Sequence, residues 1–354
     1  MTEPRVRLRP EIAAMPPYRQ GAPAPASAFK LSSNENPFEP LPGVLEAIGQ
    51  AARGLNRYPD GSNAALRERL AARSGVGAQQ VHVGAGSVTV LAELVTAASG
   101  PGDEVVYPWR SFEMYPLLPI ASGATGVPVP LTADGRHDLG AMAAAITERT
   151  RLVFLCSPNN PTGPVLRTAE AEEFLARVPR EVLVVLDEAY LEFVTDPDAA
   201  DGLALLDHHP NLVVARTFSK AWGLAGMRVG YAVGPEYVLD AARAVAVPFG
   251  VSALSQAAAL ASLDREDELM ARVAQLVQRR DRVVQGLAEQ GWAVPEAQGN
   301  FVWLPTGEQT PDAAARFAQA GLIVRALGEG VRMSIGEQDS VDPLLQIAAE
   351  IVED

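Results

Sequence analysis

Cysteine and lysine are nearly absent from this sequence. Its 354 residues include one cysteine, Cys156, so the chain can form neither an intramolecular disulfide nor a zinc site of several thiolates. The four histidines show no metal-ligand spacing, and we predict no metal site. The longest apolar runs, such as VLVVL at 182–186, are strand-length and too short to span a bilayer. The N-terminus has no apolar signal-peptide segment, and with one cysteine we expect a cytoplasmic protein.

Positive charge is also scarce. The formal net charge is −14, which argues against partners such as nucleic acid or an anionic membrane surface. Hydrophobic residues make up 48% of the chain, so a folded core is expected. The length exceeds that of a single hydrophobic core, so we expect more than one domain.

Strand-like and helical segments alternate between about residues 80 and 234. Apolar stretches such as RLVFLC (151–156), VLVVL (182–186) and NLVVAR (211–216) are separated by helical patterns. This alternation predicts an α/β fold with a mostly parallel sheet covered by helices on both faces. After about residue 250 comes a long helical tract over 253–289, with a break expected near Leu263 and Asp264, and then short strands. We therefore predict an N-terminal arm over 1–30, a large domain over 31–248 and a smaller α+β domain over 249–354.

Polar side chains follow three of the apolar strands. LVFLC is followed by Asn159 and Asn160, VLVVL by Asp187 and Tyr190, and LVVAR by Thr217, Ser219 and Lys220. In open α/β sheets, ligands bind at the carboxyl ends of the strands. The sequence therefore predicts a binding site at this edge of the sheet.

Lys220 is one of only two lysines among 29 basic residues; the other, Lys30, lies in the predicted arm and is interpreted as ordinary. Most lysines are solvated surface residues, but this one follows a buried strand. Lysine can form a Schiff base, which arginine cannot, and burial together with a cation such as Arg228 would depress the pKa of the amine. The pattern favours a nucleophilic lysine.

Asp187 ends the most apolar strand of the chain, and a buried carboxylate needs a partner. A helix cap or a structural salt bridge would satisfy it, and so would the protonated ring nitrogen of pyridoxal phosphate. Thr217, Ser219 and Arg228 form a set suited to phosphate. GAGSV (84–88) precedes a helix and suits an anion, but the third glycine of a dinucleotide fingerprint is missing, which argues against a nicotinamide dehydrogenase.

The order of NNPTG (159–163), DEAY (187–190) and SKAWGLAGMR (219–228) resembles that of the fold type I pyridoxal-phosphate aminotransferases, and within them the histidinol-phosphate aminotransferase branch. SNENPF (33–38), RYPD (57–60), GNFVWL (299–304) and VRMSIG (331–336) follow in the expected order, so the resemblance covers nearly the whole chain. It implies a large pyridoxal-phosphate-binding domain with a mostly parallel seven-stranded sheet, a smaller C-terminal domain and a homodimer.

The resemblance also implies a role for each matching position. Lys220 would hold pyridoxal 5′-phosphate as an imine and carry a proton between the substrate Cα and C4′, with Asp187 on the ring nitrogen. Tyr190 and Asn160 would hydrogen-bond the ring oxygen. The phosphate group would be held by Ser87, Val88, Thr217, Ser219 and Arg228.

Further positions concern the partner subunit and the substrate. Tyr58 would reach the phosphate of the partner's cofactor, and Phe112 would stack on the ring where many relatives have tyrosine. Arg332 would receive the substrate's carboxylate. Tyr18 and Phe112 could line an apolar slot for an aromatic side chain, and Arg325 could join Arg332 in binding a phosphate.

Two departures bear on the substrate. GAGSV lacks the acidic pair usual in histidinol-phosphate enzymes, and WRSFE (109–113) differs from their usual pattern. Both features resemble the actinobacterial aromatic amino acid (phenylalanine) aminotransferases, which implies ping-pong transamination of phenylalanine, tyrosine or tryptophan with a 2-oxo acid. Histidinol phosphate is the alternative substrate. A decarboxylase with the same cofactor and a non-catalytic, cofactor-binding sensor are alternatives of other classes.

Overall fold

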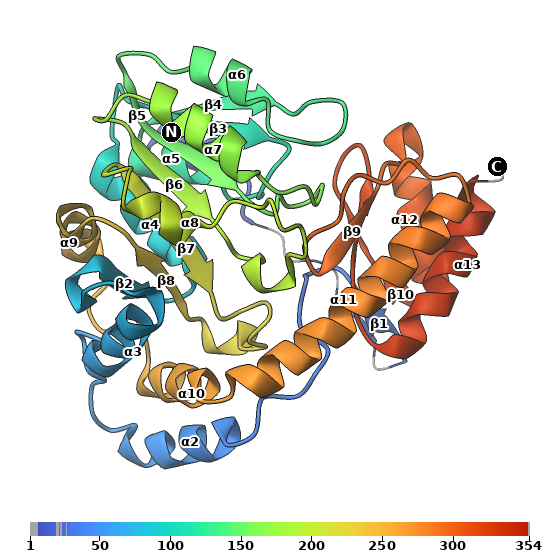
Figure 1. Ribbon diagram of the computed structural model, residues 1–354, viewed down its shortest axis with the longest axis horizontal. Helices are drawn as coiled ribbons and strands as arrows, with labels where there is room; N and C mark the ends of the chain where they lie inside the picture. Colours follow the sequence, from blue (N-terminus) through green and yellow to red (C-terminus); the bar gives the residue numbers. More distant parts are fainter. Residues whose placement is uncertain (1–5, 19–20, 22, 26, 353–354) are drawn as a thin grey trace, which may run out of the picture.

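The large part of the molecule is built on one seven-stranded sheet. The computed structural model describes residues 6–18, 21, 23–25 and 27–352. The strands are β2 (Val81–Gly84), β3 (Glu104–Trp109), β4 (Thr125–Pro130), β5 (Thr150–Cys156), β6 (Leu183–Asp187), β7 (Leu212–Thr217) and β8 (Gly230–Val233). They lie in the order β2-β8-β7-β6-β5-β3-β4, and β8 runs antiparallel to both of its neighbours while the other pairings are parallel (Figure 1).

Helices cover both faces of this sheet because its strands are apolar on both sides. Leu183 and Val185 of β6 pack with α4 (Ser87–Ala98), α5 (Leu117–Ser122) and α9 (Glu236–Val245). The alternate residues Val184 and Leu186 pack with α6 (Leu139–Ala144), α7 (Thr168–Arg177) and α8 (Gly202–Leu206) on the other face. Successive strand residues point to opposite faces, so an unbroken apolar run fills two layers at once. The predicted fold class, an α/β fold with a mainly parallel sheet between helices, is confirmed.

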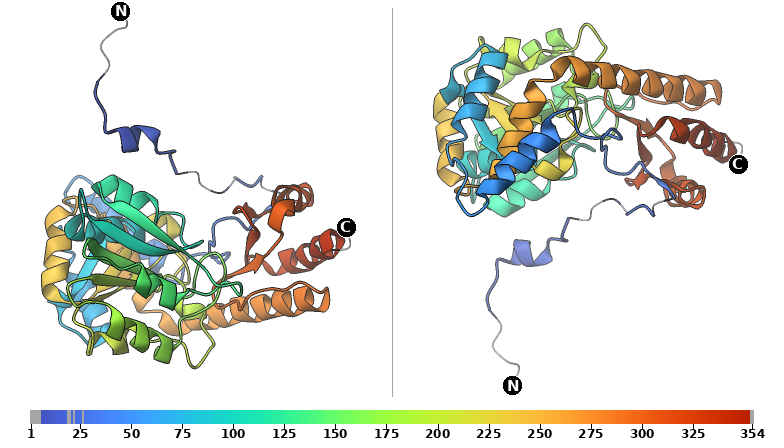
Figure 2. Two further views of the ribbon diagram at one scale, coloured as in Figure 1. Left: turned by 90° about the horizontal axis from the view of Figure 1, so that it is seen from above. Right: turned by 90° about the horizontal axis from the view of Figure 1, so that it is seen from below.

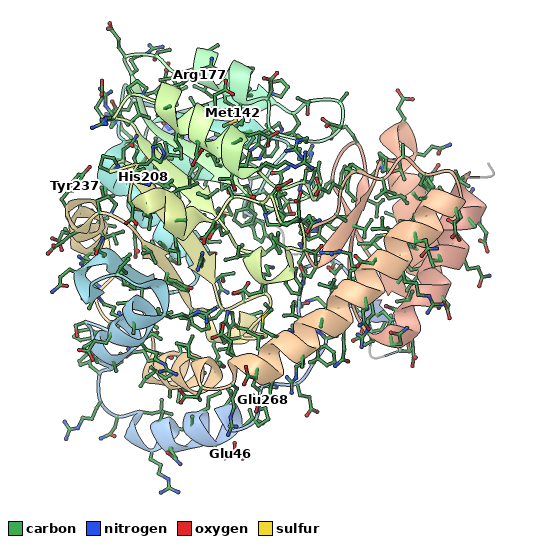
Figure 3. All side chains as sticks on the ribbon, viewed as in Figure 1. Glu46, Met142, Arg177, His208, Tyr237 and Glu268 are labelled. Atoms are coloured by element: carbon green, nitrogen blue, oxygen red, sulfur yellow. The ribbon has the colours of Figure 1, made fainter. Side chains whose placement is uncertain are left out.

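Three further helices lie at the end of the sheet where β2 is the edge strand. They are α2 (Val44–Ala51), α3 (Ala64–Ser74) and α10 (Ala253–Leu263), and α2 packs along α10 (Figure 1). Short 3-10 turns connect several elements: η1 (Ala52–Gly54), η2 (Ala78–Gln80), η3 (Leu191–Phe193), η4 (Ala225–Met227), η5 (Gly307–Gln309) and η6 (Gln338–Ser340). Side chains on the outer faces of these layers point to solvent, as Glu46 of α2 and Tyr237 of α9 do in Figure 3.

The long helix α11 (Glu266–Glu289) leads from α10 to a second, smaller group of elements (Figure 1). This group holds an antiparallel sheet in the order β11-β12-β9, made of β9 (Phe301–Leu304), β11 (Arg325–Ala326) and β12 (Val331–Ser334), with α12 (Thr310–Gln319) and α13 (Val341–Val352). Near the start of the chain, β1 (Phe29–Lys30) pairs in parallel with β10 (Leu322–Ile323). The N-terminal segment is thereby tied to the C-terminal elements.

The N-terminal helix α1 (Pro10–Ala14) lies on the outside of the molecule (Figure 2). The guanidinium of Arg9 donates to the carbonyls of Ile120 and Ala121, each at 3.0 Å, where α5 ends. Arginine at the C-terminal end of a helix satisfies carbonyls that have no partner within the helix. Across the described ranges, no helix has the length and apolar character needed to cross a membrane.

Candidate active site

A cavity of about 600 Å³ lies at the carboxyl ends of the central strands. Thirteen of the fourteen site residues predicted from the sequence line it: Tyr18, Ser87, Val88, Phe112, Asn160, Asp187, Tyr190, Thr217, Ser219, Lys220, Arg228, Arg325 and Arg332. Tyr58 is the exception. Its side chain is 83% exposed, and its ring stacks on Phe249 with the ring centroids 4.6 Å apart.

Lys220 lies three residues beyond the end of β7, and its half-buried side chain enters this cavity. Its Nζ donates to the carbonyl of Ser33 at 3.1 Å and lies 5.7 Å from the centroid of the Tyr190 ring. Burial, followed by the nearby charge of Arg332, lowers the pKa of the amine to about 7. A large fraction of the amine is therefore unprotonated and nucleophilic near neutral pH.

Asp187 is the last residue of β6 and is 3% exposed. Its Oδ2 accepts a hydrogen bond from the Tyr115 hydroxyl at 3.0 Å, whereas its Oδ1 has no hydrogen-bond partner among the described residues. Burial raises the pKa of this carboxyl to about 6. A buried acceptor without a partner is costly, so Oδ1 fits a ligand that brings its own N–H donor into the cavity.

The other end of the cavity is built to bind an anion. The twelve-residue helix α4 begins at Ser87, so its first backbone N–H groups and its dipole face this end. Arg228 donates to the Ser219 hydroxyl at 3.2 Å and lies against Gly86, where a Cβ atom would overlap the guanidinium. Gly86 also has a φ of +90°, which favours glycine. The guanidinium, hydroxyls and backbone amides together suit a phosphate group.

A hydrogen-bond network joins the cavity lining near Asn160 to β12 of the smaller group of elements. Arg332 of β12 donates to Asn160 Oδ1 and to the carbonyl of Ser32, each at 2.7 Å, and its Nε has no partner among the described residues. Asn34 donates to the Tyr190 hydroxyl at 3.0 Å. The peptide bond between Asn160 and Pro161 is cis. Arg332 therefore lies where it can meet a substrate anion beside Lys220.

Tyr115 and Asn34, which hydrogen-bond to residues of the site, are among the polar residues that sequence reasoning gave no role. Tyr115 is fully buried and stacks on Phe154, with ring centroids 4.5 Å apart, while it donates to Asp187. Asn34 has a φ of 53° and also contacts Ser334, 300 residues along the chain. Asn34 lies in SNENPF (33–38), which carried the family resemblance, and Tyr115 lies two residues beyond WRSFE (109–113). Their partners lie too far along the chain for a local pattern to reveal them.

The family model for aminotransferases of class I and II matches residues 26–349. The chain belongs to this aminotransferase family. The resemblance stated from the motifs is thereby confirmed.

This aminotransferase is similar over nearly its full length to other aminotransferases. It is 56% identical over 351 residues to an aromatic amino acid aminotransferase of Streptomyces avermitilis, with 98% of each chain covered. It is 54% identical over 354 residues to one of Streptomyces coelicolor, with 99% of each covered. A solved structure of histidinol-phosphate aminotransferase from Sinorhizobium meliloti, in complex with pyridoxal-5′-phosphate, is 29% identical and has a TM-score of 0.88, covering 100% of this chain and 99% of that one.

Proposed function

We propose that this aminotransferase transfers the amino group of aromatic amino acids to a 2-oxo acid with pyridoxal 5′-phosphate as cofactor. The observation that carries the proposal is the presence, in one cavity, of a lysine amine whose pKa burial lowers to about 7 and a buried carboxylate oxygen that has no hydrogen-bond partner in the described part of the chain. Pyridoxal phosphate meets both needs, since its aldehyde condenses with an amine and its ring nitrogen carries a proton. The two Streptomyces relatives support the choice of substrate.

The residues present fit this cofactor. Asp187 Oδ1 would accept from the ring nitrogen, and Lys220 would form the covalent link. Asn160 and Tyr190 would hydrogen-bond the ring oxygen, and Phe112, whose ring meets Tyr115 edge-on at 5.7 Å, would stack on the ring. The phosphate would be bound by Ser87, Val88, Thr217, Ser219 and Arg228.

Side chains of the protein then bind the substrate and move the proton during transamination. When bound, the cofactor supplies an electron sink for the pair released as the substrate Cα–H bond breaks. With the cofactor bound and its own amine released by the substrate's, Lys220 would take the proton from the substrate Cα and later return it, which an amine with a pKa lowered to about 7 can do near neutral pH. Arg332 binds the substrate's carboxylate and fixes the Cα–H bond toward Lys220. In the second half of the ping-pong cycle a 2-oxo acid binds at the same guanidinium and the proton moves the other way.

A second candidate substrate is histidinol phosphate. It is favoured by the fold similarity to the Sinorhizobium meliloti enzyme and by two arginines, Arg325 and Arg332, that line the cavity. We expect the holoenzyme to show a kcat/KM for phenylalanine at least about 100-fold above that for histidinol phosphate, because a site built for one substrate leaves the groups of the other unpaired. Steady-state assays with one 2-oxo acid acceptor and both amino donors measure this ratio. A preference for histidinol phosphate would refute the aromatic assignment. Release of carbon dioxide without a 2-oxo acid acceptor would indicate a decarboxylase. Binding of the cofactor without turnover of either donor would indicate a sensor.

We also propose a homodimer in which Tyr58 reaches the partner subunit's cofactor phosphate. Tyr58 is exposed and stacks on Phe249, and Val247, two residues before Phe249 in the chain, is 71% exposed, so exposed apolar side chains are available for contact with the second subunit. We expect sedimentation to give twice the 37.5 kDa chain mass. Tyr58→Phe is expected to weaken cofactor binding by about tenfold, the effect of one lost hydrogen bond to a charged group.

The matched control for this prediction is Tyr237→Phe, since Tyr237 is also exposed, at 68%, but lies on α9. Titration of each apoprotein with pyridoxal phosphate gives the two dissociation constants. A monomeric holoenzyme, or equal affinities in the two variants, would contradict the assignment of Tyr58. The cytoplasmic location stays a prediction.

A further inference from the structure

Two arginines face each other across a pair of strands at the substrate end of the cavity. Arg325 of β11 and Arg332 of β12 are direct partners in the antiparallel register, and both line the cavity. Side chains directly opposite in such a pair lie on the same face of the sheet, with Cβ atoms about 5 Å apart. Like charges in this arrangement repel one another, so the pair needs either a nearby carboxylate or a ligand that carries more than one negative charge.

The carboxylate is supplied from another part of the chain. Arg325 Nη2 donates to Glu113 Oε1 at 2.8 Å, and this ion pair is largely shielded, with side chains 16% and 26% exposed. Glu113 also lines the cavity, directly after Phe112. The charge of Glu113 also acts on Arg332. Burial lowers the pKa of the Arg332 guanidinium, whereas the negative charge of Glu113 raises this pKa and the positive charge of Arg325 lowers it. The three groups therefore act as one electrostatic unit.

The charges of this unit distinguish the two candidate substrates. Within this unit, the charges of the two arginines and the one glutamate sum to one net positive charge, which matches the single carboxylate of phenylalanine. Histidinol phosphate has no carboxylate and presents a phosphate dianion instead. Such a group would require both guanidiniums and would come close to the Glu113 carboxylate in a partly desolvated site, where screening is weak.

We propose that Glu113 is a specificity-determining residue, which by pairing with Arg325 admits the monocarboxylate of an aromatic amino acid and rejects a phosphate dianion. This inference rests on the proposed function. Specificity here comes from a repulsive group directed at the competitor as well as from attraction to the substrate. Arg332 serves either substrate, and Glu113 determines which of them it receives.

A structural role for Glu113 makes a different prediction, and the chain provides the control. The segment that holds Glu113 and the segment that holds Arg325 are joined by a second ion pair, in which Arg110 Nε lies 3.2 Å from Glu329 Oε2. Glu329 has a 76% exposed side chain and is not among the described residues that line the cavity. If Glu113 only held the segments together, removing either glutamate's charge would affect both substrates alike.

The test compares Glu113→Gln and Glu329→Gln as holoenzymes, with phenylalanine and histidinol phosphate as amino donors. For Glu113→Gln, we expect the ratio of kcat/KM for histidinol phosphate to that for phenylalanine to rise at least about tenfold, as expected when one like-charge contact is removed from a shielded site. Glu329→Gln is expected to leave the ratio within about twofold of wild type, as for an exposed pair. Glu113→Asp, which keeps the charge, is expected to stay close to wild type.

A second measurement does not depend on turnover of the competitor. Inorganic phosphate, added to the holoenzyme as a competitive inhibitor of phenylalanine, is expected to bind Glu113→Gln at least about fivefold more tightly than wild type. Should the glutamine variant fail to fold, Glu113→Ala removes the same charge and serves in its place. An unchanged ratio with an unchanged phosphate inhibition constant, or equal shifts in the Glu329 control, would overturn the proposal. Failure of the proposed function is a separate result: the wild-type enzyme itself would then prefer histidinol phosphate or not transaminate phenylalanine.

Discussion

Lys220→Arg is expected to lower kcat/KM for phenylalanine by about 10⁴-fold or more, because the chemistry needs a neutral nucleophilic amine. Arginine keeps the positive charge and similar length of the side chain, but its guanidinium is not deprotonated in proteins. Lys220 achieves the neutral form because burial and the charge of Arg332 lower its pKa to about 7. The substitution therefore removes the reactivity of the side chain while leaving most of its bulk.

Lys30→Arg is the matched control, since Lys30 is the other lysine of the chain. It lies in β1 and pairs with Glu35 at 2.6 Å, with its side chain 30% exposed, and arginine can make the same pair. We expect its kcat/KM to stay within about threefold of wild type, as for a pair at the surface. Borohydride reduction of the holoenzyme followed by peptide mass spectrometry should place the cofactor on Lys220. A label on Lys30, or an active Lys220→Arg enzyme, would be incompatible with the mechanism.

The parts of the molecule that the sequence predicted are those that depend on local patterns. The apolar strands and their polar ends place Asp187 and Lys220 at one edge of the sheet because parallel strands end together there. The break expected near Leu263 and Asp264 is confirmed, since α10 ends at Leu263 and α11 begins at Glu266. In both cases neighbouring residues in the sequence carry the information.

Contacts between segments far apart along the chain could not be predicted from local sequence patterns. β1 has two residues and pairs with β10 nearly 300 positions away, which no periodicity can reveal. At the start of α3, Asn63 occupies the N-cap position but makes no side-chain cap hydrogen bond, and Asp60 instead accepts from the Ala64 N–H at 2.7 Å. The proposed role of Glu113 likewise depends on its ion pair with Arg325, which lies 212 residues further along the chain. Such pairings depend on the tertiary fold.

Two adjacent carboxylates, Asp187 and Glu188, show how the site differs from the core around it. Both are buried, at 3% and 2% exposure. Glu188 is fully paired within the protein: Arg216 donates to its Oε2 at 2.8 Å and the Gly202 N–H donates to its Oε1 at 2.9 Å. Asp187 has one oxygen without a partner among the described residues. Glu188 thus serves stability, and Asp187 is held ready for a ligand at a cost in stability.

Asp187→Asn is expected to lower kcat by about 10³-fold, the loss typical of removing one preorganised charge that stabilises a transition state. It is not expected to destabilise the apoprotein. Burial raises the folded-state pKa of this carboxyl to about 6, so its ionisation opposes folding. That penalty develops as pH rises from about 4 to 6 and is fully present above pH 6, and asparagine removes it. Urea unfolding of the apoprotein at pH 7.5 should give a free energy at or above that of wild type.

Glu188→Gln is expected to lower stability while leaving kcat nearly unchanged, the opposite of what is expected for Asp187→Asn. It leaves the buried Arg216 without its counter-charge, so we expect the free energy of unfolding to fall by about 3 kcal/mol, as for a broken buried ion pair. The kcat of the folded enzyme should stay within about threefold of wild type, because the described contacts of Glu188 point into the core and away from the cavity lining. Measuring kcat and unfolding on both variants therefore separates catalysis from stability at neighbouring positions. Equal losses of kcat in the two, or a strongly destabilised Asp187→Asn apoprotein, would mean that Asp187 is a structural carboxylate like its neighbour.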